Sequence, residues 1–404
     1  MARSDPPDAA RDPSRRAFFR TFGRETVRQA GAVAGVAAEL RRTSMEAARV
    51  LFDPSASATD SPDTADNPQS AKVDQSAPDA TFRSPYRFTG TEIVALDARQ
   101  LPGRIQTIVL AEPSEVASAI RIGAINGGPV LAELGAYALV MAARAAVGRP
   151  DVGRDQQIHA AAGTLRAAKR EVRALAWAID RMEARYTELA GQSTDASAIA
   201  DGLKSEANSI ASEASAAHGK IGRIGATAVP PAAEEPLNLL MHGDMGPLSC
   251  GLVGMGTALI QELRDAGRAV HVWVTDAAPG GEGGRVAAFG LRQLDVPFTV
   301  IPDTAVAWLF DHRRVDALLL RGDRVCANGD CGVLIGGLSA ALVATAAGVP
   351  VHVLAPLNAV DPGAADGAAI RADTSFAPGA TRLNPQGDVV PAELITRIIT
   401  EAAT

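Results

Sequence analysis

Aromatic residues, cysteines and excess positive charge are all scarce in this chain of 404 residues. Phe, Trp and Tyr together make up only 4%, so a hydrophobic core must be built mainly from Ala, Val, Leu and Ile. The three cysteines, Cys250, Cys326 and Cys331, are too few for a disulfide framework and favour a reducing, cytoplasmic location. The net charge of −7 offers no basic surface, so we expect no nucleic-acid partner.

Long apolar runs are absent too, since none approaches the roughly 18 residues that span a bilayer. Residues 1–52 do carry Arg15 and Arg16 followed by Phe18 and Phe19, a pattern typical of a twin-arginine export signal. Charged residues interrupt the apolar stretch that should follow, and no cleavage site comes after it. We therefore interpret 1–52 as a basic, amphipathic extension that docks on a partner or a membrane surface, with export as the alternative.

Three further regions follow along the chain. Residues 53–84 are rich in Ser, Asp, Ala and Pro, and they are predicted to be a disordered linker because they cannot bury enough apolar surface to offset their ordering entropy. Residues 85–232 begin with short strand-like alternation and continue as Ala-rich helical segments at 129–146, 163–190 and 200–226. This pattern predicts a mainly helical domain with a small β region in front.

In residues 233–404, short apolar runs alternate with helix-like segments. The runs are LNLLMH, AVHVWVT, FTVI, VDALLL and VPVHVLA. Such alternation predicts an α/β domain with a parallel sheet covered on both faces. Ligands bind beyond the carboxyl ends of the strands in these sheets, and Asp323 directly follows the run VDALLL. Asp323 is either a residue of such a site or a strand-end acid that caps a turn or pairs with Arg324.

Two other short stretches have both a functional and a structural interpretation. Gly127 and Gly128 precede a helix whose first turn contains Pro129, so their N–H groups could receive an anion, although an ordinary helix start explains them equally well. Asn328–Gly329 is typical of a tight turn. The spacing of Cys326 and Cys331 does not indicate a metal site, and no cofactor is expected.

Several ordered motifs identify a family. VALDARQLP is similar to an early LDQ-x-x-LP strand, AIRIGAINGGPVLAELGAYAL to an I-x-x-M-x-V-R-G-A-P-A-I-G helix start, and GDRVCANGD to a G-A-D-R-(I/V)-x-x-N-G-D signature. The end, LNPQGDVVPAELITRIITE, is similar to N-P-x-F-D-V-T-P-x-x-L-I-T-x-I-I-T-E. From about residue 88 onward the chain thus resembles the family of methylthioribose-1-phosphate isomerase, ribose-1,5-bisphosphate isomerase and the regulatory subunits of initiation factor 2B. The resemblance implies a helical domain, a Rossmann-like domain and a homodimer.

The resemblance also implies a chemistry, the aldose-to-ketose isomerisation of a sugar 1-phosphate. An acid and a base must flank the two reacting carbons, and in the isomerases a cysteine and the aspartate of G-A-D-R share this work. Asp323 matches the aspartate. The family's T-H-C-N-x-G reads MHGDMG here, so Gly243 stands at the cysteine position, and Asp244, Cys250 or water would have to replace the thiol.

Other departures concern the contacts to an anionic substrate. Asn126 replaces an arginine, Ala278 replaces another, and Glu282 replaces a glutamine, while Arg285 is retained. The family's N-K pair reads Val333 and Leu334.

Two functions therefore remain open: a diverged aldose–ketose isomerase acting on or binding a sugar phosphate, and a non-catalytic protein that binds a metabolite or a partner. The candidate catalytic residue is Asp323, and the candidate binding residues are Gly127, Gly128, Arg285, Asp244 and His242. His242 is either a general base or a support of its turn.

Overall fold

The computed structural model describes residues 73–74, 85–125, 127–232, 235–277, 281–312, 314–371 and 387–402. The predictions for residues 1–52, and for 53–84 apart from one strand, lie outside the described residues. That strand, β1 (Val73–Asp74), pairs antiparallel with β4 (Thr107–Leu110), so at these two residues the chain departs from the predicted disordered linker. The outer edge of β4 can pair with an extended segment. Among the described helices, none combines the length and apolar character that a membrane crossing requires.

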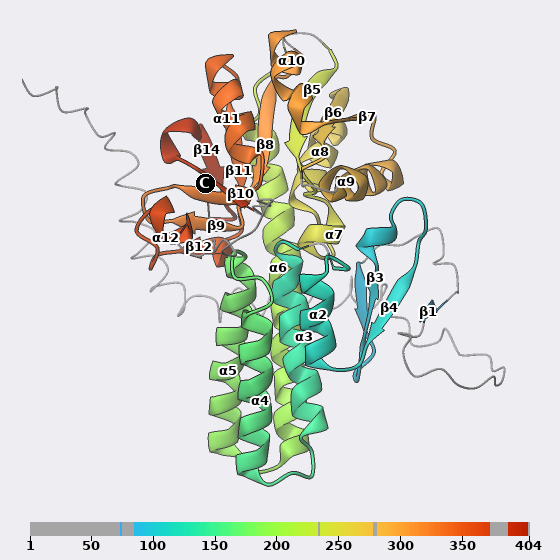
Figure 1. Cartoon of the computed structure of the whole chain (residues 1–404), viewed down its shortest axis with the longest axis vertical. Helices are drawn as coiled ribbons and strands as arrows, with labels where there is room; N and C mark the ends of the chain where they lie inside the picture. Colours follow the sequence, from blue (N-terminus) through green and yellow to red (C-terminus); the bar gives the residue numbers. More distant parts are fainter. Residues whose placement is uncertain are drawn as a thin grey trace, which may run out of the picture. The chain divides into compact units, whose positions relative to one another are not determined.

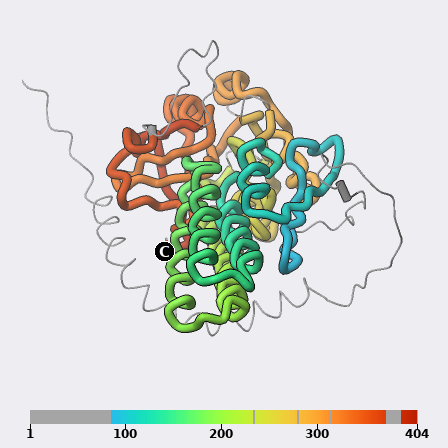
Figure 2. Tube along the Cα trace, turned by 60° about the horizontal axis from the view of Figure 1, so that its bottom comes forward, coloured from blue at the N-terminus to red at the C-terminus, as the bar shows by residue number. Residues whose placement is uncertain are grey.

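Residues 85–232 contain the short strands and the helices that their sequence pattern predicts, while their separation as a domain stays a prediction. Strands β2 (Tyr86–Phe88), β3 (Ile93–Leu96) and β4 form an antiparallel sheet. Five helices follow, and four of them, α3 to α6, lie side by side in Figures 1 and 2. They are α2 (Pro113–Arg121), α3 (Val130–Ala145), α4 (Asp151–Arg166), α5 (Arg173–Gln192) and α6 (Ala196–Ala228). Helix α3 is buried along most of its length, as its apolar sequence predicts.

The helical segment expected at 163–190 is wrong as one continuous helix, because α4 ends at Arg166 and α5 begins at Arg173. The break has a tertiary cause. The backbone N–H of Arg173 donates to the carbonyl oxygen of Asp323 at 3.0 Å. This bond satisfies one of the N–H groups that a helix start leaves without an intrahelical partner. The first turn of α5 therefore contacts the strand end that carries the candidate catalytic acid.

A six-stranded parallel sheet forms the second half of the fold, as the alternating pattern predicts. Its strand order is β14-β11-β8-β5-β6-β7, and every neighbouring pair is parallel. The strands are β5 (Leu237–His242), β6 (Val270–Thr275), β7 (Phe298–Ile301), β8 (Ala317–Arg321), β11 (Val351–Leu354) and β14 (Arg397–Ile399). The α/β fold class is thereby confirmed.

Both faces of this sheet are covered. Along β8, Ala317 and Leu319 belong to one hydrophobic cluster and Leu318 and Leu320 to another, as the two-residue period of a strand requires. Helix α8 (Met255–Asp265) and the C-terminal half of α6 contribute to the first cluster. Helices α10 (Val306–Asp311) and α11 (Gly337–Ala346) contribute to the second. Two short elements complete this part near the sheet, α7 (Pro247–Cys250) and α9 (Glu282–Gln293).

Helix α6 serves both halves because it packs closely on α8. At Gly222, an added Cβ would lie 2.5 Å from the Cβ of Ala258, so only glycine permits this approach.

A further four-stranded sheet, of order β12-β9-β10-β13, was not predicted from the sequence. Its strands are β9 (Arg324–Cys326), β10 (Cys331–Leu334), β12 (Val360–Asp361) and β13 (Gly387–Val390). Strands this short leave too few residues for a recognisable alternation.

Candidate functional site

The candidate site lies at the carboxyl ends of two central, neighbouring strands. β5 and β8 pair in parallel, with His242 opposite Leu320. The segments that leave them, beginning at Gly243 and Gly322, therefore emerge at the same edge of the sheet. This is the edge where parallel α/β sheets bind their ligands.

Asp323 is buried and forms an ion pair that the sequence analysis did not identify. Its two carboxylate oxygens accept hydrogen bonds from Nε and Nη2 of Arg321, at 2.8 and 3.2 Å. The alternative partner considered from the sequence, Arg324, instead donates to Asp361 at 2.8 Å. Asp323 is therefore held by the last residue of its own strand, and one lone pair on each of its oxygens is used by Arg321.

Arg321 connects three segments of the site. Besides Asp323, its Nη1 donates to the carbonyl oxygen of Asp244 at 2.7 Å, and its Nη2 donates to that of Gly127 at 2.8 Å. A Cβ on Gly128 would lie 3.0 Å from the guanidinium carbon and 2.8 Å from the carbonyl oxygen of Ser249, so glycine is required there. The structure thus brings together four of the predicted site residues, Gly127, Gly128, Asp244 and Asp323. The signal for Arg321 was its place in the signature, where G-A-D-R has glycine two residues before the acid.

Asp244 and Cys250 were the two candidates to replace the missing cysteine. The carboxylate of Asp244 accepts from the hydroxyl of Ser249 at 2.6 Å and from the backbone N–H of Gly246 at 3.0 Å, and burial raises its pKa. Cys250 is fully buried at the end of α7, and burial raises the pKa of its thiol to about 12. Because the thiolate is the reactive form, Cys250 in this position is a poor substitute for a catalytic cysteine.

The position of the family's cysteine has been rebuilt around glycine. Gly243 has a φ of +79°, a left-handed conformation that other residues adopt only with strain. An added Cβ there would lie 2.9 Å from Cδ2 of Leu334 and 3.4 Å from Cβ of Ala277. Leu334 itself stands where the family has the lysine of its N-K pair. The two departures are therefore packed against each other, and a thiol at this point would need both backbone strain and movement of Leu334.

His242, at the end of β5, has both ring nitrogens in use. Nε2 lies 2.9 Å from the carbonyl oxygen of Ile335, and Nδ1 lies 2.8 Å from the hydroxyl of Thr275. Since a carbonyl oxygen only accepts, Nε2 carries the proton and Nδ1 accepts from Thr275. Burial lowers the pKa of this imidazole, so it is neutral. This geometry favours the interpretation in which His242 supports its turn.

The remaining predicted residues lie elsewhere or outside the described part. Arg285, on α9, donates from Nε to the carbonyl oxygen of Leu101 at 3.2 Å, while Glu282 is the first residue of the same helix. Asn126 and Ala278 lie outside the described residues. The tight turn expected at Asn328–Gly329 is present between β9 and β10, where Gly329 has a φ of +92°. Within the described ranges, no group of three or more His, Cys, Asp or Glu side chains is placed to hold a metal ion.

Two further residues beside the site were missed. Lys169 follows α4, and its Cδ would lie 3.1 Å from a Cβ on Gly127, so a lysine side chain runs alongside the helix start. Glu133, on α3, is 1% exposed, and Tyr86 donates to its Oε2. Burial raises the pKa of Glu133 to about 8. The only sequence signal for Glu133 was a single acid inside the apolar run VLAELGAYALVMAA.

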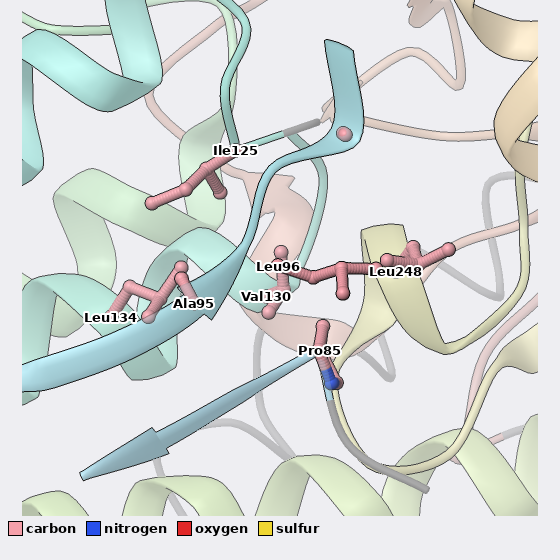
Figure 3. Close-up of a pocket in the computed structure, with 8 residues that line it drawn as sticks. Pro85, Ala95, Leu96, Ile125, Val130, Leu134 and Leu248 are labelled. Atoms are coloured by element: carbon pink, nitrogen blue, oxygen red, sulfur yellow. The ribbon is translucent and has the colours of Figure 1, made fainter. Parts of the chain in front are cut away.

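A small pocket lies next to this region, but its chemistry is apolar. Figure 3 shows Leu96 and Val130 on one side and Leu248 of α7 on the other. Ile125 also lines it, so the pocket borders the chain just before and just after Gly127–Gly128. All the residues that line it are Pro, Ala, Leu, Ile or Val. It offers no charged group to a phosphate, so we place the candidate site at Asp323 rather than in this pocket.

The fold and the motifs together define a class, and comparison with known proteins bears this out. Residues 124–403 match the initiation factor 2 subunit family, and the chain belongs to this family. Methylthioribose-1-phosphate isomerase from Synechococcus sp. is 32% identical over 334 residues, which cover 79% of this chain and 94% of that protein. The resemblance stated from the motifs is therefore confirmed.

Solved structures show the same fold at lower identity. 5-Methylthioribose 1-phosphate isomerase from Pyrococcus horikoshii OT3 superimposes with a TM-score of 0.67 at 23% identity, covering 80% of this chain and 92% of that one. The delta subunit of translation initiation factor eIF-2B from A. fulgidus gives a TM-score of 0.62 at 21% identity, covering 79% and 94%. Both branches of the family thus share this architecture.

Proposed function

We propose that this chain is a diverged aldose–ketose isomerase-type protein that acts on or binds a sugar phosphate at the carboxyl ends of β5 and β8. The observation that carries the proposal is the position of Asp323, which retains the acid of the G-A-D-R signature beside the helix start at Gly127–Gly128. The relative that is 32% identical over 79% of the chain is named methylthioribose-1-phosphate isomerase, which supports a phosphorylated sugar as the ligand class. Lys169, alongside Gly127, supports an anionic group at the same place.

Isomerisation moves a hydrogen between two adjacent carbons, so it needs a group that removes a proton and one that returns it. In this proposal Asp323 supplies that group, and it acts without the thiol of the family's isomerases. A single carboxylate would have to do both while Arg321 stabilises its charged form. We therefore expect turnover, if the correct sugar is supplied, to be far below that of an enzyme with two proton-transfer groups, by roughly 10²-fold or more.

A second function, binding without catalysis, is favoured by a separate observation. Position 243 is a glycine with Leu334 packed beside it, so it offers no thiol. Cys250 is buried and the pKa of its thiol is raised, so it offers no reactive thiol either. A protein of this kind would use the same edge of the sheet, at the carboxyl ends of β5 and β8, to bind a metabolite that regulates a partner. In either case the homodimer remains a prediction, which light scattering of the purified chain would test.

The deciding experiment follows ketose formation by NMR with methylthioribose 1-phosphate and with ribose 1,5-bisphosphate. Wild type is compared with Asp323→Asn and with the matched control Asp361→Asn, which removes the acid of another Arg–Asp pair, the one with Arg324. Turnover that Asp323→Asn abolishes and Asp361→Asn retains would support isomerisation. Binding in a thermal-shift assay without turnover would support the second function. The absence of both binding and turnover with every sugar phosphate tested would contradict the proposal.

A further inference from the structure

Arg321 is a buried cation whose hydrogen-bonding capacity is nearly exhausted by the protein itself. It is 6% exposed; burial lowers its pKa, but the charge and hydrogen bonds of Asp323 outweigh this and raise the pKa overall, so Arg321 stays charged. A guanidinium has five N–H donors. Four of them bond here: two to Asp323, one to the carbonyl oxygen of Asp244 and one to that of Gly127. Only the bonds to Asp323 are bonds to a charged group.

We propose that Arg321 is the anion-binding residue of this chain and that Asp323 occupies it as a built-in competitor. A phosphate or carboxylate group of the ligand would replace the Asp323 carboxylate on the guanidinium and release Asp323 toward the rest of the ligand. The planar fork of arginine donates to carboxylate and to phosphate oxygens with the same paired geometry, so the exchange needs no new orientation of Arg321. This inference rests on the proposed function in taking the ligand to be anionic.

The surrounding contacts favour exchange at Arg321 over a purely structural ion pair. The carbonyl oxygens of Gly127 and Asp244 hold the guanidinium at two points that do not involve Asp323, so it stays in place when the carboxylate leaves. The backbone of Gly128 also packs closely on the guanidinium, since a Cβ there would lie only 3.0 Å from it, and this further fixes its position. Lys169 adds a second cationic side chain beside Gly127. Arg321 would therefore keep its position while an anion replaces the Asp323 carboxylate.

The test measures binding of inorganic phosphate by calorimetry to wild type, Asp323→Asn and Asp323→Asn combined with Arg321→Met. Asparagine keeps the size of the side chain and removes its charge, so it removes the competitor. We expect the phosphate Kd of Asp323→Asn to be at least tenfold lower than that of wild type. The double variant should lose this gain. Because the acid is removed from a buried pair, Asp323→Asn could unfold in phosphate-free buffer, and its melting temperature should then rise with added phosphate more than that of wild type.

Asp361→Asn is the matched control, since Asp361 forms a comparable pair with Arg324 on the neighbouring sheet. An equal gain in Asp361→Asn would mean that any arginine deprived of its acid binds phosphate, and this would overturn the inference. So would an unchanged Kd in Asp323→Asn, or a gain that survives loss of Arg321. Failure of the wild type to bind any sugar phosphate would count against the proposed function. Tight phosphate binding by Asp323→Asn would still support the exchange.

Discussion

Replacing Glu133 by glutamine should stabilise this protein at neutral pH, although it removes a residue from the core. Glu133 is 1% exposed on α3; its Oε2 accepts from Tyr86, and its Oε1 has no hydrogen-bond partner in the described part of the chain. A Cβ on Gly251 would lie 2.0 Å from Oε1, so the carboxyl packs directly against that glycine. Burial raises the pKa of Glu133 from 4.5 to about 8, and the hydrogen bond from Tyr86 only partly offsets this.

The sign of the effect follows from which state binds the proton. Between pH 4.5 and about 8 the folded chain keeps Glu133 protonated, while the unfolded chain releases the proton, so the free energy of unfolding falls as the pH rises. The slope is about 1.4 kcal/mol per pH unit. At pH 7 the loss is therefore about 3 kcal/mol. Glutamine cannot ionise, so Glu133→Gln should lack this slope and gain about that amount.

The assay is urea unfolding at about pH 5 and at about pH 7.5, with the free energy extrapolated to water. Wild type and Glu133→Gln should differ by less than about 1 kcal/mol at the lower pH and by roughly 4 kcal/mol at the higher one. Glu188→Gln is the control, because Glu188 lies on the surface and Arg185 lowers its pKa, so no gain at higher pH is expected. Equal stability of wild type and Glu133→Gln at both pH values would refute the reasoning.

Two other predictions concern the missing thiol. Gly243→Ala should destabilise the fold by roughly 1–3 kcal/mol, because the alanine would have a left-handed backbone and its Cβ would lie 2.9 Å from Leu334. Adding Leu334→Ala to this variant should recover part of the lost free energy of unfolding, as measured by urea unfolding. Full stability of Gly243→Ala would argue against a closed position. Cys250, Cys326 and Cys331 are all buried, so folded protein should resist iodoacetamide at about pH 8 and react at all of them only after denaturation, as mass spectrometry would show.

Much of the fold could be predicted because its strands are continuous apolar runs. VDALLL contains four consecutive apolar residues after Asp316, and these residues form most of β8, whose side chains alternate between two cores. The break between α4 and α5 could not be predicted, since no proline or glycine marks it. Its cause lies 150 residues away, in the carbonyl oxygen of Asp323 that accepts from Arg173. Local propensity carries no information about such a partner.

The candidate site could be predicted in part, because the ends of the regular elements can be located in the sequence. Gly127, Gly128, Asp244 and Asp323 meet because they follow or precede regular elements whose ends converge, and the order of the motifs indicates this. Arg321 is different: it is the last residue of a buried strand, where an arginine reads as a simple end of an apolar run. Only the three-dimensional arrangement shows that its fork faces Asp323 and the carbonyl oxygens of Gly127 and Asp244.

The pairing of Arg321 with Asp323 changes what the retained acid signifies. A family signature records that an aspartate is present, but proton transfer requires a carboxylate that is free to approach the ligand. Here the substitution of glycine by Arg321, two residues before the acid, supplies a buried countercharge to that same acid. An aspartate without such a countercharge would be costly to bury, so the two residues are expected to depend on each other. The proposed activity therefore depends less on whether Asp323 is retained than on whether a ligand can replace it on Arg321.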